Sequence, residues 1–278
     1  MKPMSDKVDI AAWRKYELAE SQLKGFTRSA VRTKIMLYLQ EGEKNSGELE
    51  KEFGVRASTI LHSIKEMIDS DIVKKGNKGY VLTNVGRIQA LLLDNLVSAI
   101  LVIDTFKNFW LSHNTDDIPD HLLEQIGMLN QSEILEGDIA NILKTQEYWI
   151  SEVINSKEIA GVSPIITPAY PEAIVKALQN GAKVDLILTK PVFEIVLKDY
   201  RDALNALLKM ENFTLYRIDK DLKIAYTVTD SYLSLGLFRL EGGYDVGNDL
   251  NCFGEGAIKW GKKLFEYHKS MSLLIKSI

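Results

Sequence analysis

Residues Arg56–Lys78 read RASTILHSIKEMIDSDIVKKGNK, and this stretch decides the fold of the N-terminal part of the chain. From about Ala57 to Ser70, apolar residues recur at helical spacing and the opposite face is polar. Next come Ile72–Lys75 and Tyr80–Leu82, which have the composition of short strands, joined by the glycine-rich turn Gly76–Gly79. The stretch therefore predicts a helix followed by a β-hairpin.

Two further helices are predicted upstream of this stretch. Ser29–Gln40 places apolar residues at broadly helical spacing until Gly42 ends the pattern. Ser46 is a suitable N-cap for a second helix, Gly47–Phe53, which Gly54 terminates. The order helix, helix, glycine turn, helix, hairpin is that of a winged helix-turn-helix.

In a winged helix, the third helix enters the major groove and its short polar side chains reach base edges and phosphates. We therefore expect double-stranded DNA as a partner, contacted by this helix and by the basic hairpin. The expected contacts are Arg56, Ser58, Thr59, His62, Ser63, Lys65, Lys74, Lys75 and Lys78. The same residue types also suit a helix cap and a charged surface that contacts no DNA.

The distribution of charge is uneven along the chain. Residues 1–90 hold 16 Lys and Arg against 12 Asp and Glu, whereas the remainder holds 18 against 26. A basic surplus favours a polyanion because neutralising phosphates releases counterions. Only the first part of the chain is suited to nucleic acid, although a surplus of this size also arises by ordinary scatter.

A long apolar helix is predicted after the hairpin. Thr83 is a suitable N-cap, and the pattern continues to about Leu111. The most apolar part, Ile88–Ile103, contains Asp94 and Asn95 and falls short of the roughly 18 to 20 uncharged residues that a membrane span needs. We expect it to be buried in protein, against an N-terminal helix, the C-terminal domain or the same helix of a second subunit.

The periodicity changes in the second half of the chain. His113–Gly137 is expected to be a connector with a short helix, and Gly137–Ser156 a further helix. Strands and helices then alternate, which predicts an α/β domain around a mixed sheet and an α+β chain as a whole. The predicted strands are Lys157–Val162, Val184–Thr189, Phe213–Arg217, Ile224–Thr229 and Tyr232–Phe238. The predicted helices are Pro171–Asn180, Phe193–Met210 and Gly254–Ser270.

Three parts are expected along the chain, with 46% apolar residues in 278, enough to fill more than one core. They are a DNA-binding domain over 1–84, a helical linker or dimerisation region over 85–156, and a signal-sensing domain over 157–278. Met1–Asp9 lacks the apolar core of a signal peptide, so a cytoplasmic protein without a membrane partner is expected.

A small-molecule site is predicted where strands end. Gly161–Pro164 and Leu188–Pro191 follow two predicted strands at their carboxyl ends, where open α/β sheets usually bind ligands. The residues expected to bind an effector are Ser163, Tyr170, Thr189, Tyr226 and Ser234. Shaping of loops and core packing explain these residues equally well, and the sequence does not identify the effector.

No metal or other cofactor is predicted. Cys252 is the only cysteine, which excludes an internal disulfide and a cysteine-rich zinc site. Gly242-Gly243 and Gly254-Glu255-Gly256 are expected to be turns outside the strand-to-helix context of a nucleotide loop. The histidines are His62, His113, His121 and His268. They are widely spaced, and no two of them stand at i, i+4 with a carboxylate beside them, so a metal site is not expected.

Several runs of residues resemble known regulators. Ser58–Ile64 with Ile72–Lys75 resembles the recognition helix and wing of ArsR-like and MarR-like regulators. Other runs look like the C-terminal domain of archaeal winged-helix regulators of the methanogenesis regulatory or filament-related family. These runs are Ser163–Ile165, Ala169–Glu172, Val184–Thr189, Thr227–Asp230, Leu233–Phe238 and Tyr244–Leu250. The resemblance covers nearly the whole chain and implies a homodimeric transcription factor of a methanogenic archaeon.

The same domain is distantly similar to the phospholipase D sheet and to the sensor domain of TrmB-type regulators. A phospholipase D motif needs a histidine nucleophile, a lysine two residues later and an aspartate five after that. Counted back from Asp230, these positions hold Lys223 and Ala225, so the resemblance implies a catalytically dead domain and no enzyme. The alternatives are a divergent phosphodiesterase or nucleotide-binding enzyme whose winged helix binds protein, and a protein adaptor.

Overall fold

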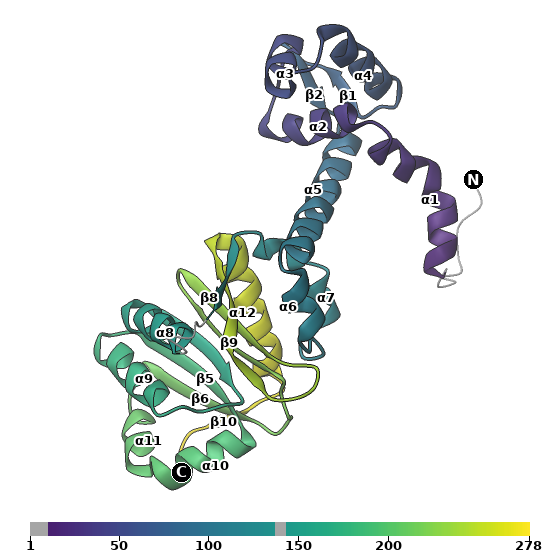
Figure 1. The fold of residues 1–278 in the computed structure, drawn as a ribbon. Helices are drawn as coiled ribbons and strands as arrows, with labels where there is room; N and C mark the ends of the chain where they lie inside the picture. The colour runs from purple at the N-terminus through teal and green to yellow at the C-terminus, as the bar shows by residue number, and fades with distance from the viewer. Residues whose placement is uncertain (1–10, 137–142) are drawn as a thin grey trace, which may run out of the picture. The chain divides into compact units, whose positions relative to one another are not determined.

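The computed structural model describes residues 11–136 and 143–278 (Figure 1). Contacts divide the chain into two units, one ending at Asp94 and the other beginning at Asn95. The first is mainly helical and the second is built on a mixed sheet, so the predicted α+β class is confirmed. The segment Met1–Asp9 and the start of the predicted helix Gly137–Ser156 lie outside the described residues.

The N-terminal unit has the predicted order of helices and hairpin. Its elements are α1 (Ala12–Thr27), α2 (Ala30–Tyr38), the 3-10 turn η1 (Leu39–Glu41), α3 (Ser46–Phe53), α4 (Ala57–Asp69), β1 (Val73–Lys75) and β2 (Tyr80–Leu82). The strands β1 and β2 pair antiparallel, with Lys74 opposite Val81. Apolar residues of these elements form one core, which includes Ile35, Leu49, Ile60, Ile64 and Val73.

The helix ends in this unit have specific caps. Asn45 caps α3, and Ser46 does not: Glu48 N donates to Asn45 Oδ1 at 3.0 Å, and Asn45 N donates to Glu48 Oε2 at 2.7 Å. This reciprocal capping box needs an acidic residue three positions after the cap. Glu48 stands three positions after Asn45 and meets this condition. Gly54 ends α3 in the left-handed region, at φ 61°. Ser29 caps α2.

The helix α5 (Asn84–Thr105) begins as predicted, since Gly86 N donates to Thr83 Oγ1 at 3.0 Å. It ends earlier than predicted because Phe106 leaves the helical conformation (φ −108°, ψ 29°), and α6 (Lys107–Ser112) follows as a separate helix. The 22 residues of α5 are long and apolar enough to cross a membrane by length and composition.

The side chains of α5 are largely uncovered. Only 11% of its most apolar window is buried, and Ile88, Leu92 and Leu96 are 60%, 66% and 55% exposed. The expectation that this stretch is buried is therefore wrong for the single chain. The physical reason is that only a few positions of the helix, such as Ala90 and Val102, contact a core of their own chain.

The C-terminal unit contains an eight-stranded sheet in the order β10-β6-β5-β4-β7-β8-β9-β3. The neighbours β4, β5 and β6 are parallel, and the remaining pairs are antiparallel, so the sheet is mixed as predicted. The strands are β3 (Ser132–Glu136), β4 (Glu158–Ser163), β5 (Lys183–Thr189), β6 (Phe213–Ile218), β7 (Ile224–Thr229), β8 (Tyr232–Phe238), β9 (Tyr244–Phe253) and β10 (Leu273–Ile275).

Helices cover both faces of this sheet (Figure 1). They are α7 (Asp120–Leu123), the 3-10 turn η2 (Ile126–Leu129), α8 (Lys144–Asn155), α9 (Ala169–Gln179), α10 (Lys190–Asp199), α11 (Arg201–Leu207) and α12 (Gly254–Ser270). On one face α12 packs its Trp260 among residues that include Val228. On the other, α8 to α11 form a second core with residues such as Val184. Adjacent strand positions alternate between the two cores, as the pleat requires.

The sequence expectations for this unit differ from the structure in three respects. The predicted helix Phe193–Met210 is broken at Tyr200 (φ −133°, ψ 25°) into α10 and α11. The strands β3, β9 and β10 were not predicted. The run Gly254-Glu255-Gly256 was expected to lie outside a strand-to-helix context. Gly254 instead follows β9 directly and begins α12, so the run lies at a strand-to-helix junction. There Gly254 has φ 78°, and a side chain at this position would collide with Gln131.

Candidate functional site

The surface of α4 and the hairpin carries most of the predicted DNA contacts. The exposed members are Arg56, Ser58, Thr59, His62, Lys65, Lys74, Lys75 and Lys78. Ser63 is the exception: it is only 4% exposed, because it lies on the side of α4 that packs into the core beside Ile64. The expectation that Ser63 contacts DNA is therefore wrong.

The first turn of α4 leaves its polar side chains at the surface. Arg56 occupies the N-cap position without a side-chain cap bond, and Ala57 N donates to Glu50 Oε1 at 3.3 Å. Ser58 is therefore not the helix cap. The Glu50 carboxylate thus lies at the positive end of the helix dipole, and Arg56 is exposed at the same end of α4.

The hairpin is held in shape by the residues before α3. Lys78 N and Gly79 N both donate to Glu43 Oε1, at 2.5 and 2.6 Å. Lys44 pairs with Tyr80 through two backbone hydrogen bonds of 3.2 and 2.9 Å. Gly79 is required here, because a Cβ at this position would collide with the Lys44 carbonyl group. The backbone of the turn is thus fixed before any partner binds.

The lysines of the hairpin are free to meet a partner's charge. Within the described residues, none of Lys74, Lys75 and Lys78 forms an ion pair. By contrast, His62 Nε2 lies 3.6 Å from Glu66 Oε1, and this carboxylate also lies 3.5 Å from Arg32. The hairpin is therefore the more strongly basic part of the surface.

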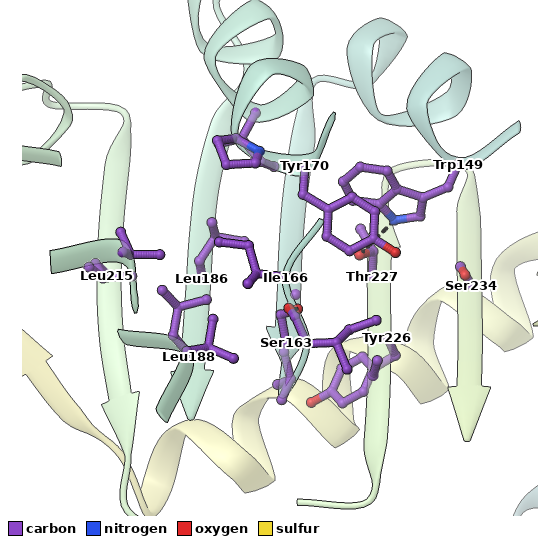
Figure 2. Close-up of a pocket in the computed structure, with 18 of the residues that line it drawn as sticks. Trp149, Ser163, Ile166, Tyr170, Leu186, Leu188, Leu215, Tyr226, Thr227 and Ser234 are labelled. Carbon is purple, nitrogen blue, oxygen red and sulfur yellow. Dashed lines mark hydrogen bonds between the residues drawn. The ribbon is translucent and has the colours of Figure 1, made fainter. Parts of the chain in front are cut away.

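A cavity of about 130 Å³ lies in the C-terminal unit between the sheet and helices α8 to α11 (Figure 2). Four of the five predicted effector residues line it: Ser163, Tyr170, Tyr226 and Ser234. Thr189 does not line it. It is 3% exposed at the start of α10, so the expectation for Thr189 is wrong.

Tyr226 lines the cavity without offering its hydroxyl group to it. Its Oη lies 2.9 Å from His268 Nδ1, on α12, and Figure 2 shows the hydroxyl directed toward that helix. Burial raises the pKa of Tyr226 well above its usual value and lowers the pKa of His268 to about 4. The Tyr226 ring lines the cavity while its hydroxyl group is bound by His268, so a role for Tyr226 in binding an effector stays a prediction.

One end of the cavity is aliphatic and the other is polar and aromatic. The aliphatic wall includes Ile166, Leu186, Leu188, Val192, Leu204 and Leu215. At the polar end, Trp149 Nε1 donates to Thr227 Oγ1 at 3.0 Å. The Trp149 and Tyr170 rings lie 4.6 Å apart at a tilt of 45° (Figure 2). Such a site suits a molecule with one apolar and one polar part.

Asp249 places a carboxyl group at the polar end. Tyr244 Oη donates to Asp249 Oδ1 at 3.2 Å. Burial raises the pKa of Asp249 to about 6, although hydrogen bonds from Tyr244 and Ser234 oppose the shift. Gly236 leaves room for this pair, because a Cβ there would collide with Tyr244 Oη and lie 2.7 Å from Asp249 Oδ1.

Sequence reasoning missed Trp149, Tyr244 and Asp249. Two of them belong to the run Tyr244–Leu250, which carries part of the family resemblance. That run was not predicted as a strand, so nothing placed its side chains beside the ends of other strands. Had β9 been predicted as a strand, Tyr244 and Asp249 would have been placed in the sheet.

Asp230 has a structural role at the turn between β7 and β8. It accepts hydrogen bonds from Lys157 N at 2.9 Å and Glu158 N at 3.3 Å, which joins this turn to the start of β4. Lys223 Nζ pairs with Asp221 at 2.7 Å. Over residues 11–136 and 143–278, no group of three His, Cys, Asp or Glu is placed to hold a metal.

The geometry defines a two-part protein, with a winged helix-turn-helix followed by an α/β domain that contains a cavity. Residues 20–101 match the N-terminal domain of methanogenesis regulatory protein FilR1, and residues 142–271 match its middle domain. The chain belongs to this family of archaeal methanogenesis regulatory proteins.

A curated relative and two solved structures are similar to this chain. Methanogenesis regulatory protein FilR1 of Methanothrix harundinacea (strain 6Ac) is 36% identical over 255 residues, which are 90% of this chain and 57% of the relative. The chain thus spans little more than half the length of that relative.

Among solved structures, TrmBL2, an archaeal chromatin protein whose structure shows a novel mode of DNA binding, is 14% identical with a TM-score of 0.43. The similarity covers 95% of this chain and 100% of that one. Phosphatidylserine synthase of Haemophilus influenzae Rd KW20 is 11% identical with a TM-score of 0.41, over 52% and 40% of the two chains. Scores at this level establish no function, and the phospholipase D likeness stays a prediction.

Proposed function

We propose that this chain is a cytoplasmic, sequence-specific DNA-binding transcription regulator that works as a homodimer. The observation that carries the proposal is the exposed surface of α4 and the hairpin, where Lys74, Lys75 and Lys78 lie without carboxylate partners among the described residues. Unpaired cations beside an exposed polar helix suit a phosphate backbone and the base edges next to it.

The three parts of the chain have separate roles in this proposal. Residues 1–84 bind DNA, 85–156 link and dimerise, and 157–278 bind an effector in the cavity beside Tyr170 and Ser234. An effector changes DNA affinity only if it binds one arrangement of the dimer better than the other. No catalytic step is proposed, since Lys223 and Ala225 stand where a phospholipase D motif has its histidine and lysine.

The homodimer is supported by the uncovered side of α5. Ile88, Leu92, Leu96 and Ile100 recur at intervals of four residues and are 54 to 66% exposed. A continuous apolar stripe on a soluble helix is normally covered by another element. A second copy of the chain offers the same stripe, which is the condition for a twofold symmetric interface.

The test of DNA binding is fluorescence anisotropy of the full chain titrated into labelled duplexes from its own upstream region, with a shuffled duplex of equal length as control. The proposal expects tighter binding to one upstream duplex than to the shuffled one, and weaker binding to both as salt rises. Absence of binding to every duplex in dilute buffer would overturn it.

A further inference from the structure

We propose that the cavity of the C-terminal unit binds a small amphiphilic organic cation, with an alkylammonium head at Asp249 and a compact apolar body against the aliphatic wall. This inference rests on the proposed effector site and deepens it by naming the class of ligand. It does not depend on DNA binding.

The head group is indicated by the surroundings of the Asp249 carboxyl group. Asp249 is partly buried and lines the cavity, and its side chain accepts a hydrogen bond from Tyr244. In the described part of the chain no Lys or Arg forms an ion pair with it, because the nearby Arg239 is bound to Asp245. A carboxylate partly withdrawn from water and without a counter-ion is destabilised, and an ammonium group in the cavity would supply the counter-ion.

The aromatic side chains favour the same charge. The faces of tryptophan and tyrosine rings are electron-rich and attract organic cations. Trp149 and Tyr170 stand side by side at the polar end (Figure 2). Tyr170 stays a neutral phenol at physiological pH, since burial raises its pKa to about 12. The indole N–H of Trp149 is already bound to Thr227, so the ring contributes its face rather than its donor.

The remainder of the cavity sets the size and polarity of the body. Its volume of about 130 Å³ is close to the roughly 150 Å³ of an apolar protein cavity that binds benzene. Leu186, Leu188 and Val192 line this space. Gly161 also lines this space, and a Cβ there would lie 3.3 Å from Thr227 Oγ1 and 3.5 Å from a Leu186 methyl group. A six-membered carbocycle is therefore a suitable body.

The match of charges predicts how pH affects binding. The titratable groups that act on Asp249 are Tyr170 and Tyr244, which line the cavity, and Tyr232, Asp245 and His113 outside it. An amine remains charged over the whole range from pH 5 to 7.5, whereas Asp249, with a pKa of about 6, ionises within it. Affinity for the cation should therefore rise roughly tenfold from pH 5 to pH 7.5.

The experiment is isothermal titration calorimetry of the full chain, without DNA, against three probes of matched shape: cyclohexylamine, cyclohexanol and cyclohexanecarboxylate. We expect the amine to bind most tightly and to gain affinity as pH rises. Asp249→Asn should weaken the amine at least tenfold at pH 7.5, and Asp199→Asn, which alters an exposed carboxylate on α10, should leave it unchanged.

The proposal is overturned if cyclohexanol or cyclohexanecarboxylate binds as tightly as the amine, if no probe binds at any pH, or if Asp249→Asn keeps full affinity. Should Asp249→Asn fail to fold, the pH dependence of the unaltered chain decides, since a flat profile also overturns the proposal. Amine binding that leaves DNA affinity unchanged would contradict the effector role and still support the cation site.

Discussion

His113 Nε2 lies 3.2 Å from Asp245 Oδ2, and both side chains are buried. Asp245 is also bound by Arg239 through two hydrogen bonds of 3.0 and 3.1 Å. His113 directly follows α6, whereas Asp245 belongs to β9, the strand that brings Asp249 to the cavity. The contact therefore connects the strand that carries Asp249 to the segment that follows α6 in the chain.

Replacing His113 tests how much this contact contributes to the stability of the C-terminal unit. His113→Ala leaves Asp245 with one partner fewer and removes the bond between His113 Nδ1 and Phe109 O, which is 2.8 Å long. We expect the C-terminal unit to lose about 2 kcal/mol of unfolding free energy, measured by urea titration with tryptophan emission. His62→Ala, at a side chain that is 73% exposed, is the control and should change it by less than about 0.5 kcal/mol. An equal loss of unfolding free energy in the two variants would contradict a stabilising role for His113.

The raised pKa of Asp249 has a consequence for stability against pH. The folded chain binds this proton more tightly than the unfolded chain, whose carboxyl titrates near 3.8, so the contribution of Asp249 to stability falls as pH rises from about 4 to about 6. At full extent the loss is on the order of 3 kcal/mol. Asp249→Asn should remove it, and thermal unfolding at a series of pH values provides the measurement. A constant difference between the two proteins from pH 4 to pH 7 would show that the carboxyl is not perturbed.

His268 produces the opposite slope in the same range. Burial lowers its pKa from 6.5 to about 4, so the unfolded chain takes up this proton first and stability falls as pH drops from about 6.5 to 4. His268→Gln keeps a polar partner for Tyr226 Oη and removes the titration. We expect the variant to lose less stability than the unaltered chain between pH 6.5 and pH 4.5, by the same thermal unfolding series. Parallel profiles would mean that the pKa of His268 is the same in the folded and the unfolded chain.

The wing lysines should appear in the salt dependence of DNA binding. Each phosphate contact that is lost reduces the slope of log affinity against log salt by about 0.9. Lys74→Ala with Lys75→Ala should therefore lower the slope by about 2, measured by anisotropy at several salt concentrations. Lys198→Ala with Lys209→Ala removes the same charge from exposed positions of the C-terminal unit and should leave the slope unchanged. Identical slopes for the wing variant and the unaltered chain would show that Lys74 and Lys75 do not contact the DNA phosphates.

The sequence predicted the elements whose signals are local. Gly54, which ends α3 in the left-handed region, and the glycine turn before Tyr80 each mark a boundary through the residues next to it, and the N-terminal fold follows from such signals. Ser63 lies in the core although it directly follows exposed His62. Each residue of a helix is rotated by about 100° from the one before, so neighbours in sequence can face the surface and the core.

The cavity was only partly predictable. Ser163 and Tyr170 follow from the rule that ligands bind at strand ends, but Asp249 depends on β9, whose ten residues mix glycine, asparagine and aspartate and lack a strand's usual composition. Its place in the sheet is fixed by pairing with β8 and β3. Pairing between strands distant in sequence is a tertiary property that a local pattern does not contain.

The exposed stripe of α5 makes the oligomeric state a sharp test. Leu92→Glu with Leu96→Glu places two charges on positions that are 66% and 55% exposed in the single chain, so the monomer should fold normally. In a dimer the same positions become buried, and the unpaired carboxylates would oppose association. We expect sedimentation equilibrium to give a dimer for the unaltered chain and a monomer for this variant. Leu240→Glu with Val246→Glu, at positions 64% and 66% exposed elsewhere in the C-terminal unit, should remain dimeric. A monomeric unaltered chain at micromolar concentration, or a dimer that survives the α5 charges, would exclude this stripe as the interface.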